Sequence, residues 1–277
     1  MSGRGPVGTL TAGTLTGGAL RAAAFPARWP VRLAWIGLLL YALYAASILG
    51  VTWERFVQGL DNGARFLDRM FPPNLAPDKL ELLWTGMVES IQIAVLATVF
   101  GILGSLPLGL MAARNLTPPW LSWTARGLIA VLRSFHSVIV AILFVKAVGF
   151  GALAGILALV VSTMGFVSKL FADAIEEISM KQAEAVRATG ATFMSVIAMG
   201  VLPQVMARFV GFSTYQLDSN LRNSTMVGLV GGGGIGATLF TAYQRFDYDF
   251  VLTILLAIIL LIMVAEVGAR RLRRIFQ

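Results

Sequence analysis

The 277-residue chain contains no cysteine and a single histidine, His136, and only 13% of its residues are charged. The absence of cysteine excludes disulfides and thiolate metal ligands, and it leaves the redox compartment undefined. A single histidine argues against a histidine-based metal centre. A membrane-embedded enzyme would need a convergent set of acid, base or metal-binding groups, for which one histidine offers little. The composition therefore gives no support to a catalytic role or to a bound cofactor or metal.

Long apolar runs are what the chain does contain. Hydrophobic residues make up 57% of it and the mean hydropathy is +0.79, which lies outside the range of soluble globular domains. Crossing about 30 Å of hydrocarbon takes about 20 helical residues. The sequence predicts an all-α membrane protein with about six transmembrane helices, in the windows 33–51, 84–111, 127–147, 151–171, 206–231 and 249–269.

The distribution of basic residues predicts the topology. With the N-terminus in the cytoplasm, 14 of the 22 Lys and Arg residues fall on the cytoplasmic side. Five fall outside, namely Arg55, Arg65, Arg69, Lys79 and Arg245. This asymmetry satisfies the positive-inside rule, so both termini are expected in the cytoplasm. The net charge of +8 then needs no nucleic acid to explain it.

The predicted organisation has a long, mostly apolar core flanked by short basic ends. Residues 1–32 contain no acidic residue and are expected to form a disordered cytoplasmic segment. A cleaved signal peptide is the alternative for the first apolar window, but 19 uncharged residues are long for one, which favours an uncleaved helix over 33–51. An extracytoplasmic segment is then expected over 52–83. The core is expected over 84–269, with a cytoplasmic loop at 172–205 inside it, and a basic cytoplasmic C-terminus over 270–277.

Within the loop, the stretch KQAEAVRATGATFMSVIAMGVLPQ at 181–204 mixes charged and small residues. Its alanines, such as Ala183 and Ala185, would let a partner approach the backbone closely. Gly190 has the backbone freedom to separate two short helices. Pro203 suits an early position of the next helix, where its missing N–H is harmless.

This stretch resembles the EAA loop of the permease subunits of bacterial ABC importers. Glu184-Ala185-Val186 is followed after three intervening residues by Gly190, and after nine more intervening residues by Gly200-Val201-Leu202-Pro203. Gly200 stands where the family usually has Ile or a similar residue. An ordinary amphipathic surface helix is the plain alternative, but the Leu-Pro pair and the membrane helix after it favour the EAA loop. The resemblance implies contact with an ATPase subunit through Glu184, Ala185, Ala188, Gly190, Leu202 and Pro203.

A second stretch, LDSNLRNSTMVGLVGGGGIG at 217–236, resembles permeases for phosphonate and, more distantly, methionine. With RNLTPP at 114–119 and FADAIEEI at 171–178, the resemblance covers about residues 80–270. It implies a type I, methionine- or phosphonate-permease-like fold in the bacterial inner membrane, a homodimer, two cytoplasmic ATPase subunits that hold ATP and Mg, and a periplasmic or lipid-anchored binding protein. Phosphonate, phosphite or hypophosphite is the expected substrate, with methionine or another small solute as the alternative.

The glycine-rich run is not a nucleotide-binding loop, because no G-x-x-x-x-G-K-[ST] pattern exists and no lysine is followed by Ser or Thr. The glycines are expected to interrupt the fifth membrane helix near the outer face. The glycines either permit close packing between helices or form part of an outer gate, and the sequence leaves both roles open. The residues concerned are Gly231, Gly232, Gly233, Gly234 and Gly236.

Ionisable groups inside the membrane windows mark a candidate transport route, since each is costly in hydrocarbon. Asp218 and Arg222, four residues apart on one helix, are expected to pair. The polar residues of these windows either hold the helix bundle together by hydrogen bonds and ion pairs or line a pathway for an anion, and the sequence leaves both roles open. A transporter driven by an ion gradient is less favoured because no internal repeat is visible. The candidate pathway residues are Arg133, Ser134, His136, Asp218, Asn220, Arg222, Asn223 and Ser224.

Overall fold

The structure is a computed structural model that describes residues 28–276. Most of the predicted N-terminal segment 1–32, and the last residue of the segment 270–277, lie outside these residues. The described residues are almost all helical and contain no β-strand. The helices are α1 (Arg28–Ile48), α2 (Trp53–Met70), α3 (Pro77–Ala112), α4 (Pro119–Ser134), α5 (Ser137–Val148), α6 (Ala152–Glu176), α7 (Met180–Ala188), α8 (Phe193–Val196), the π-helical turn η1 (Ile197–Val201), α9 (Leu202–Leu229), α10 (Ile235–Gln244) and α11 (Tyr248–Phe276).

The chain divides into two units, residues 1–64 and residues 65–277. In the first unit, α1 is apolar and exposed on every side, as Trp35, Leu40 and Tyr41 show. A helix that is hydrophobic all round and uncovered by protein is suited to lipid. The predicted first membrane helix is therefore present, ending at Ile48 rather than residue 51.

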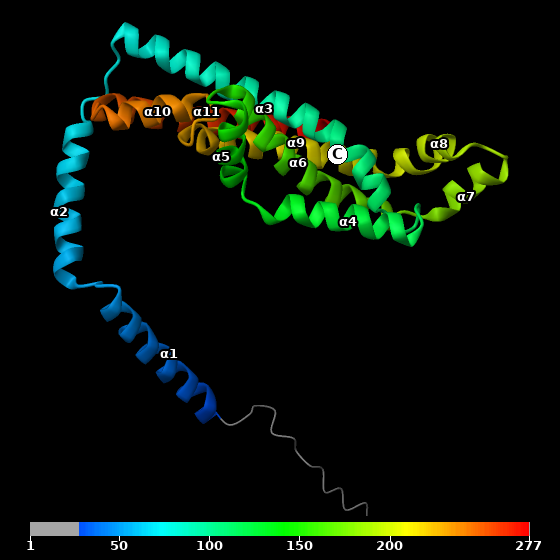
Figure 1. Ribbon diagram of the computed structural model, residues 1–277, viewed down its shortest axis with the longest axis horizontal. Helices are drawn as coiled ribbons and strands as arrows, with labels where there is room; N and C mark the ends of the chain where they lie inside the picture. The colour runs from blue at the N-terminus through cyan, green and yellow to red at the C-terminus, as the bar shows by residue number, and fades with distance from the viewer. Residues whose placement is uncertain (1–27, 277) are drawn as a thin grey trace, which may run out of the picture. The chain divides into compact units, whose positions relative to one another are not determined.

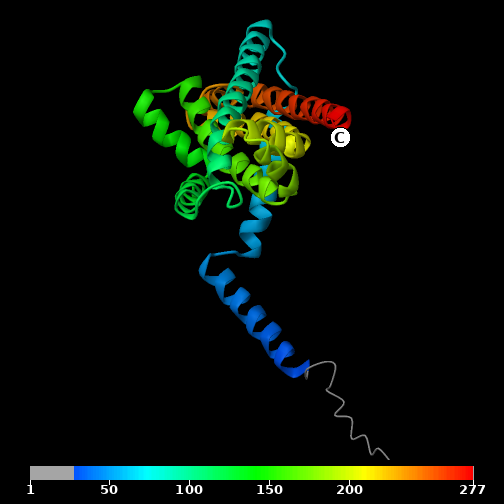
Figure 2. The ribbon, with the colours of Figure 1, turned by 90° about the vertical axis from the view of Figure 1, so that its right-hand side faces the viewer.

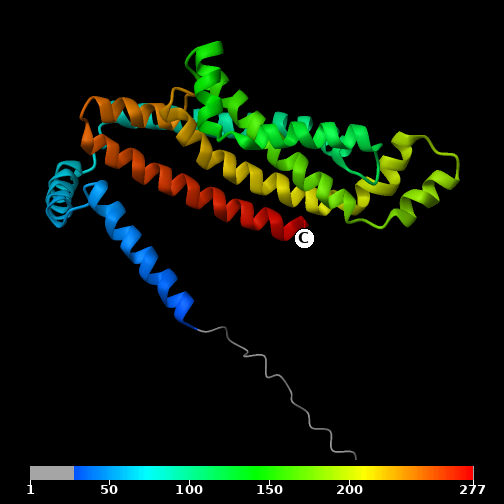
Figure 3. The same cartoon turned by 60° about the horizontal axis from the view of Figure 1, so that its bottom comes forward.

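The second unit is a helical bundle centred on α3, α6 and α9. Helices α4 and α5 pack on α6, and α10 and α11 pack on α9 (Figures 1 and 3). In the view turned by 90°, these outer helices lie on different sides of the central three (Figure 2). Small residues bring α3 and α6 close together: a Cβ added to Gly101 would lie 2.4 Å from Thr163, and one on Gly109 would lie 2.7 Å from Phe171. Such contacts are typical of packing between membrane helices, where there is little hydrophobic driving force.

The predicted third span is not one continuous helix. The described residues hold five helices able to cross a membrane, and six when the bent pair α4 and α5 counts as one span. The pair bends by 88° because Phe135 is extended and His136 starts a new helix by accepting a hydrogen bond at Nδ1 from the Val138 N–H. The prediction of about six spans is confirmed, whereas the continuous helix over 127–147 is wrong.

Candidate functional site

The loop between α6 and α9 projects beyond the ends of α3 and α4 (Figure 1). It consists of α7, α8 and η1. Gly190 has φ of +78° between α7 and α8, a conformation that side chains disfavour, so it separates the two short helices as expected. Thr192 then caps α8 by accepting a hydrogen bond from the Ser195 N–H. The loop is thus a folded helical hairpin.

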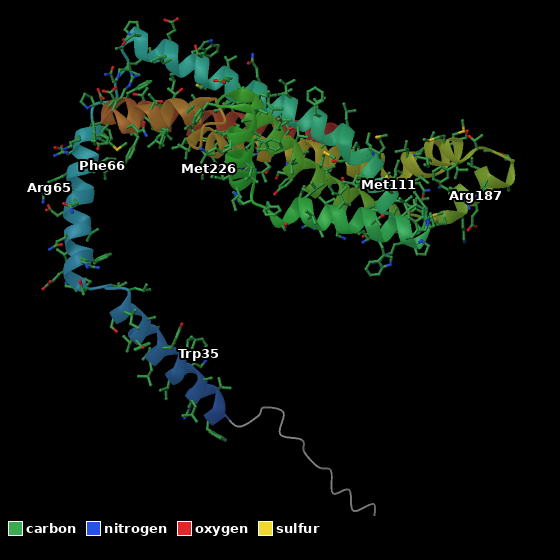
Figure 4. The ribbon with its side chains drawn as sticks, in the orientation of Figure 1. Trp35, Arg65, Phe66, Met111, Arg187 and Met226 are labelled. Atoms are coloured by element: carbon green, nitrogen blue, oxygen red, sulfur yellow. The ribbon has the colours of Figure 1, made fainter. Side chains whose placement is uncertain are left out.

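Helix α7 has a buried and an exposed side. Ala183 is buried, while Glu184, Ala185, Arg187 and Ala188 are exposed. Figure 4 shows Arg187 on the part of the loop farthest from the bundle. The exposed side is the surface that a partner subunit can reach, and it carries three of the residues assigned to coupling by resemblance.

Ala183 packs inward on Gly200 of η1. A Cβ on Gly200 would lie 2.8 Å from the Ala183 Cα, so a side chain larger than hydrogen does not fit without a shift of backbone. Gly200, which departs from the family pattern, is therefore explained by the crossing of α7 and η1. Leu202 packs against the same buried cluster, which includes Phe171, Val196 and Val205, and Pro203 lies in the first turn of α9 as expected.

The base of the loop is held by a carboxylate that sequence reasoning missed. Glu176, at the end of α6, accepts hydrogen bonds from the Arg114 N–H and from Arg126 Nη2, both at 2.7 Å. Arg126 Nε also donates to the Ala112 carbonyl at 2.9 Å. Asn115 Nδ2 donates to the Ile175 carbonyl at 2.8 Å. The stretches around 114–119 and 171–178 were distinguishable in the sequence, but their contact was not.

The start of α9 is tied back to the loop as well. Gln204 Nε2 donates to the carbonyls of Gly200 at 2.5 Å and Ser179 at 3.3 Å. Arg208 and Glu177 form an exposed ion pair. These contacts attach the loop to both α6 and α9.

The predicted ion pair on α9 is present. Arg222 Nη2 donates to Asp218 Oδ2, and the two side chains differ sharply in exposure, at 47% for Arg222 and 8% for Asp218. Within the part of the chain that the structure describes, the buried Asp218 Oδ1 has no hydrogen-bond partner. The guanidinium therefore faces outward from this chain while its counter-ion is enclosed.

Three other candidate pathway residues of α9, Asn220, Asn223 and Ser224, make their hydrogen bonds away from this pair. Two residues along an α-helix turn a side chain by about 200°, so Asn220 points away from Asp218. Asn223 donates to Ser219, and Ser224 to the Leu221 carbonyl. The polar residues of α9 thus serve different faces.

Asn220 instead joins three helices at the centre of the bundle. Its Nδ2 donates to Thr98 of α3 at 2.9 Å and to Thr163 of α6 at 3.0 Å. Its Oδ1 accepts a hydrogen bond from Gln216 Nε2 at 3.0 Å. Asn220 is fully buried, so the contacts support the role of polar glue at this position.

The remaining candidate pathway residues lie where α4 ends and α5 begins. Arg133, Ser134 and His136 are exposed there. Ser134 Oγ donates to the Val131 carbonyl, and His136 caps α5. Among the described residues, no hydrogen bond or ion pair joins these three to Asp218 or Arg222. They are placed by the helix break rather than by a shared polar network with α9.

The glycine run forms the tight turn from α9 to α10. Gly231, Gly233 and Gly234 have positive φ, which only glycine adopts readily. A Cβ on Gly232 would lie 2.4 Å from Val227, and one on Gly236 would lie 2.0 Å from the Thr225 carbonyl oxygen. Helix α10 then begins with the Ile235 N–H donating to Ser90 Oγ of α3 at 2.8 Å. The expected interruption of the fifth helix is confirmed, and these contacts support close packing.

Comparison with protein families decides the class of the chain. Residues 105–277 match the family described as "Binding-protein-dependent transport system inner membrane component". The chain belongs to this family. The match begins within α3 and includes the loop α7–η1, the α9 ion pair and the glycine run. The candidate coupling loop and the candidate substrate route on α9 therefore both lie within the residues that match the family. The chain is a multi-pass membrane protein.

Curated relatives narrow the comparison. The phosphite transport system permease protein of Stutzerimonas stutzeri is 35% identical over 242 residues, which are 87% of this chain and 86% of the relative. The phosphate-import permease protein of Mycolicibacterium smegmatis is 42% identical over 200 residues, 72% of this chain. The matched region is only 37% of that relative's length. A probable D-methionine transport system permease protein of Pasteurella multocida is 29% identical over 68% of this chain and 92% of the relative.

Solved structures agree on the fold. A chain from the inward-facing conformations of the MetNI methionine ABC transporter matches with a TM-score of 0.64 and 25% identity, covering 73% of this chain and all of its own length. A chain from an amino acid ABC transporter matches with a TM-score of 0.57 at 18% identity. The predicted type I ABC permease fold is thereby confirmed.

Proposed function

We propose that the chain is the membrane subunit of an ATP-driven importer for phosphonate or a related reduced-phosphorus oxyanion, such as phosphite or hypophosphite. The observation that carries this proposal is the 35% identity to a phosphite permease over 86% of that relative's length. The match to the methionine permease has a lower identity, 29%, which makes methionine or another small solute the competing assignment.

The proposed assembly is a homodimer in the bacterial inner membrane. Each copy contacts one cytoplasmic ABC ATPase, which holds ATP and Mg, and a periplasmic or lipid-anchored binding protein delivers the substrate. The exposed side of α7, with Glu184, Ala185 and Ala188, supports a docking role because small side chains let a partner approach closely. The chain itself performs no ATP hydrolysis in this proposal, and lipid covers the outer faces of its spans.

Coupling would follow from how the loop is attached. When the ATPases draw together, a force on α7 passes through the Ala183–Gly200 contact to α9. The Glu176 carboxylate resists separation of α6 from the α3–α4 turn. Because both routes run through packed elements, the spans would move as rigid bodies between inward- and outward-facing states. Gly190, Leu202 and Pro203 set the shape of the loop that makes this possible.

For the substrate route, the outward-facing guanidinium of Arg222 is the leading candidate. Its planar fork can donate two hydrogen bonds to two oxygens of an oxyanion, and Asp218 offsets its charge when no anion is present. Arg133, Ser134 and His136 at the α4–α5 break, and Asn223 and Ser224 on α9, are the further candidates. Asn220 would hold α9 against α3 and α6 through its hydrogen bonds. The turn from Gly231 to Gly236 is the candidate outer gate.

Uptake in a bacterial host that lacks its own phosphite and methionine importers tests the proposal. The chain is produced with its ATPase and binding protein, and uptake of radiolabelled phosphite and methionine is measured. We expect phosphite uptake that requires all three proteins, and co-purification of the ATPase with the tagged chain in mild detergent. Methionine uptake without phosphite uptake would transfer the assignment to the competing solute, and failure of the ATPase to co-purify would contradict the assembly.

A further inference from the structure

Helix α2 carries an apolar face that the membrane bundle does not account for. In its part that belongs to the first unit, Trp53, Phe56, Val57 and Leu60 follow the i, i+3, i+4, i+7 spacing of one helix face. The rings of Trp53 and Phe56 stack with centroids 5.4 Å apart. Polar residues such as Gln58 and Asn62 occupy the opposite face. The helix is therefore strongly amphipathic.

The apolar face is open. The four side chains are between 47% and 76% exposed, and they adjoin one another along the helix. A contiguous exposed apolar patch of this kind marks a surface that contacts a partner or a membrane. The polar face bears three acidic and three basic residues: Glu54, Asp61, Asp68, Arg55, Arg65 and Arg69. It carries no net charge that would select an anionic or a cationic partner.

Helix α2 directly follows α1 in the chain, and its C-terminal part belongs to the second unit, where it contacts the start of α11 at the end opposite the coupling loop. Only residues 49–52 separate it from the end of α1, and four residues reach at most about 14 Å. In the second unit, the centroids of the Phe66 and Tyr248 rings lie 4.9 Å apart at the start of α11. Figure 4 labels Phe66 on α2. Met70 is 3% exposed and packs in the cluster that contains Phe250. The short connection to one apolar helix and the contact with the start of another make the membrane surface a natural environment for α2.

We propose that α2 lies in the boundary between headgroups and acyl chains of the leaflet opposite the coupling loop, with Trp53, Phe56, Val57 and Leu60 turned toward the acyl chains. Tryptophan is enriched at this depth, and amphipathic helices with a wide apolar face bind there through apolar contact. The neutral polar face means that binding does not depend on anionic lipid.

A permanent occupant fits the open face better than a transient one. A binding protein that docks only during transport would leave four large apolar side chains in water for the rest of the cycle, at an unfavourable free energy. The membrane is always present, and the tethers make its contact with α2 intramolecular in effect. A second copy of the chain would instead pair two α2 helices, which distance measurements detect.

The absence of cysteine allows a direct test, because each single-cysteine variant carries one label. Spin labels are placed on the apolar face by Phe56→Cys, Val57→Cys and Leu60→Cys, and on the polar face by Gln58→Cys and Asn62→Cys. Leu39→Cys in α1 serves as the membrane reference. The full-length chain is reconstituted in phosphatidylcholine vesicles with and without phosphatidylglycerol. Collision rates with dissolved oxygen and with a water-soluble nickel chelate report depth.

We expect severalfold lower nickel collision rates at 56, 57 and 60 than at 58 and 62, with oxygen showing the reverse, in both lipid compositions. Equal access of the nickel chelate to all five positions would overturn the proposal. Protection of the apolar face that appears only when the binding protein is added would assign the face to that protein. Broadening between labels at equivalent positions of two copies would assign it to a dimer contact.

Discussion

Gly200 lies directly against Ala183, so that a Cβ on Gly200 would stand 2.8 Å from the Ala183 Cα and 3.3 Å from its backbone nitrogen. One residue belongs to the turn that leads into α9, and the other to the helix proposed to meet the ATPase. The cluster around Val196 and Val201 closes the space behind them. Because the two backbones lie in contact and belong to one buried cluster, we expect the contact to transmit motion.

The Gly200→Ala variant tests this contact. The added methyl group must displace backbone, and overpacking of this kind lowers the free energy of unfolding by about 1–3 kcal/mol. Gly127→Ala in α4 is the matched control, because nothing lies within 4 Å of a Cβ there. Thermal unfolding in detergent should show a lower midpoint for Gly200→Ala alone, and equal midpoints would contradict the tight crossing.

The Glu176 carboxylate is predicted to stabilise the base of the loop. Glu176→Ala leaves Arg126 Nη2 and the Arg114 N–H without this acceptor, and hydrogen bonds to charged groups contribute about 1.5–3 kcal/mol each. The neighbouring Glu177→Ala removes only an exposed pair with Arg208, worth about 0–1 kcal/mol. Unfolding midpoints of the two variants should differ clearly. Similar losses in both would show that Glu176 has no special position.

Gly190 supplies a sharp test of the loop's shape. Its φ of +78° is inaccessible to proline, which is fixed near −65°, whereas asparagine adopts positive φ more readily than other residues. Gly190→Pro should insert in the membrane and lose substrate uptake, while Gly190→Asn should retain most of it. Uptake and membrane abundance are measured together. Normal uptake by the proline variant would remove this loop from the coupling route.

The Asp218–Arg222 pair separates a structural role from a transport role. Asp218→Asn alone leaves Arg222 without its counter-ion and should reduce the amount of assembled protein. The double variant Asp218→Asn with Arg222→Gln removes both charges and should assemble with the ATPase. If Arg222 meets the anion, this double variant imports poorly; uptake near the wild-type level in well-assembled protein would show that the pair only holds the bundle.

The membrane spans could be predicted from the sequence because hydrophobic length alone selects them. The turn at the glycine run and the positions of Gly190 and Pro203 could also be predicted, since each depends on local backbone chemistry. The 88° break before His136 could not, because no proline or glycine marks it and the extended backbone of Phe135 is not apparent from the sequence.

Long-range partners were equally beyond reach. The hydrogen bonds of Asn220 involve Thr98 and Thr163, which lie 122 and 57 residues away, and no local pattern links them. The amphipathic helix α2 is different, because its spacing is visible in the sequence within the segment 52–83, although that segment contains no apolar run long enough to span a membrane. Its apolar face follows from periodicity, while its exposure required the structure.

Vesicles that contain only the purified chain, its ATPase and its binding protein provide the decisive measurement. ATP is supplied on the side of the coupling loop, and entry of radiolabelled phosphite and methionine is followed for the wild type and for Gly190→Pro. We expect ATP-dependent accumulation of phosphite by the wild type, no comparable accumulation of methionine, and loss of uptake in the variant. Phosphite entry that is absent, or that proceeds without ATP, would contradict the assignment of the chain as the membrane subunit of an ATP-driven oxyanion importer.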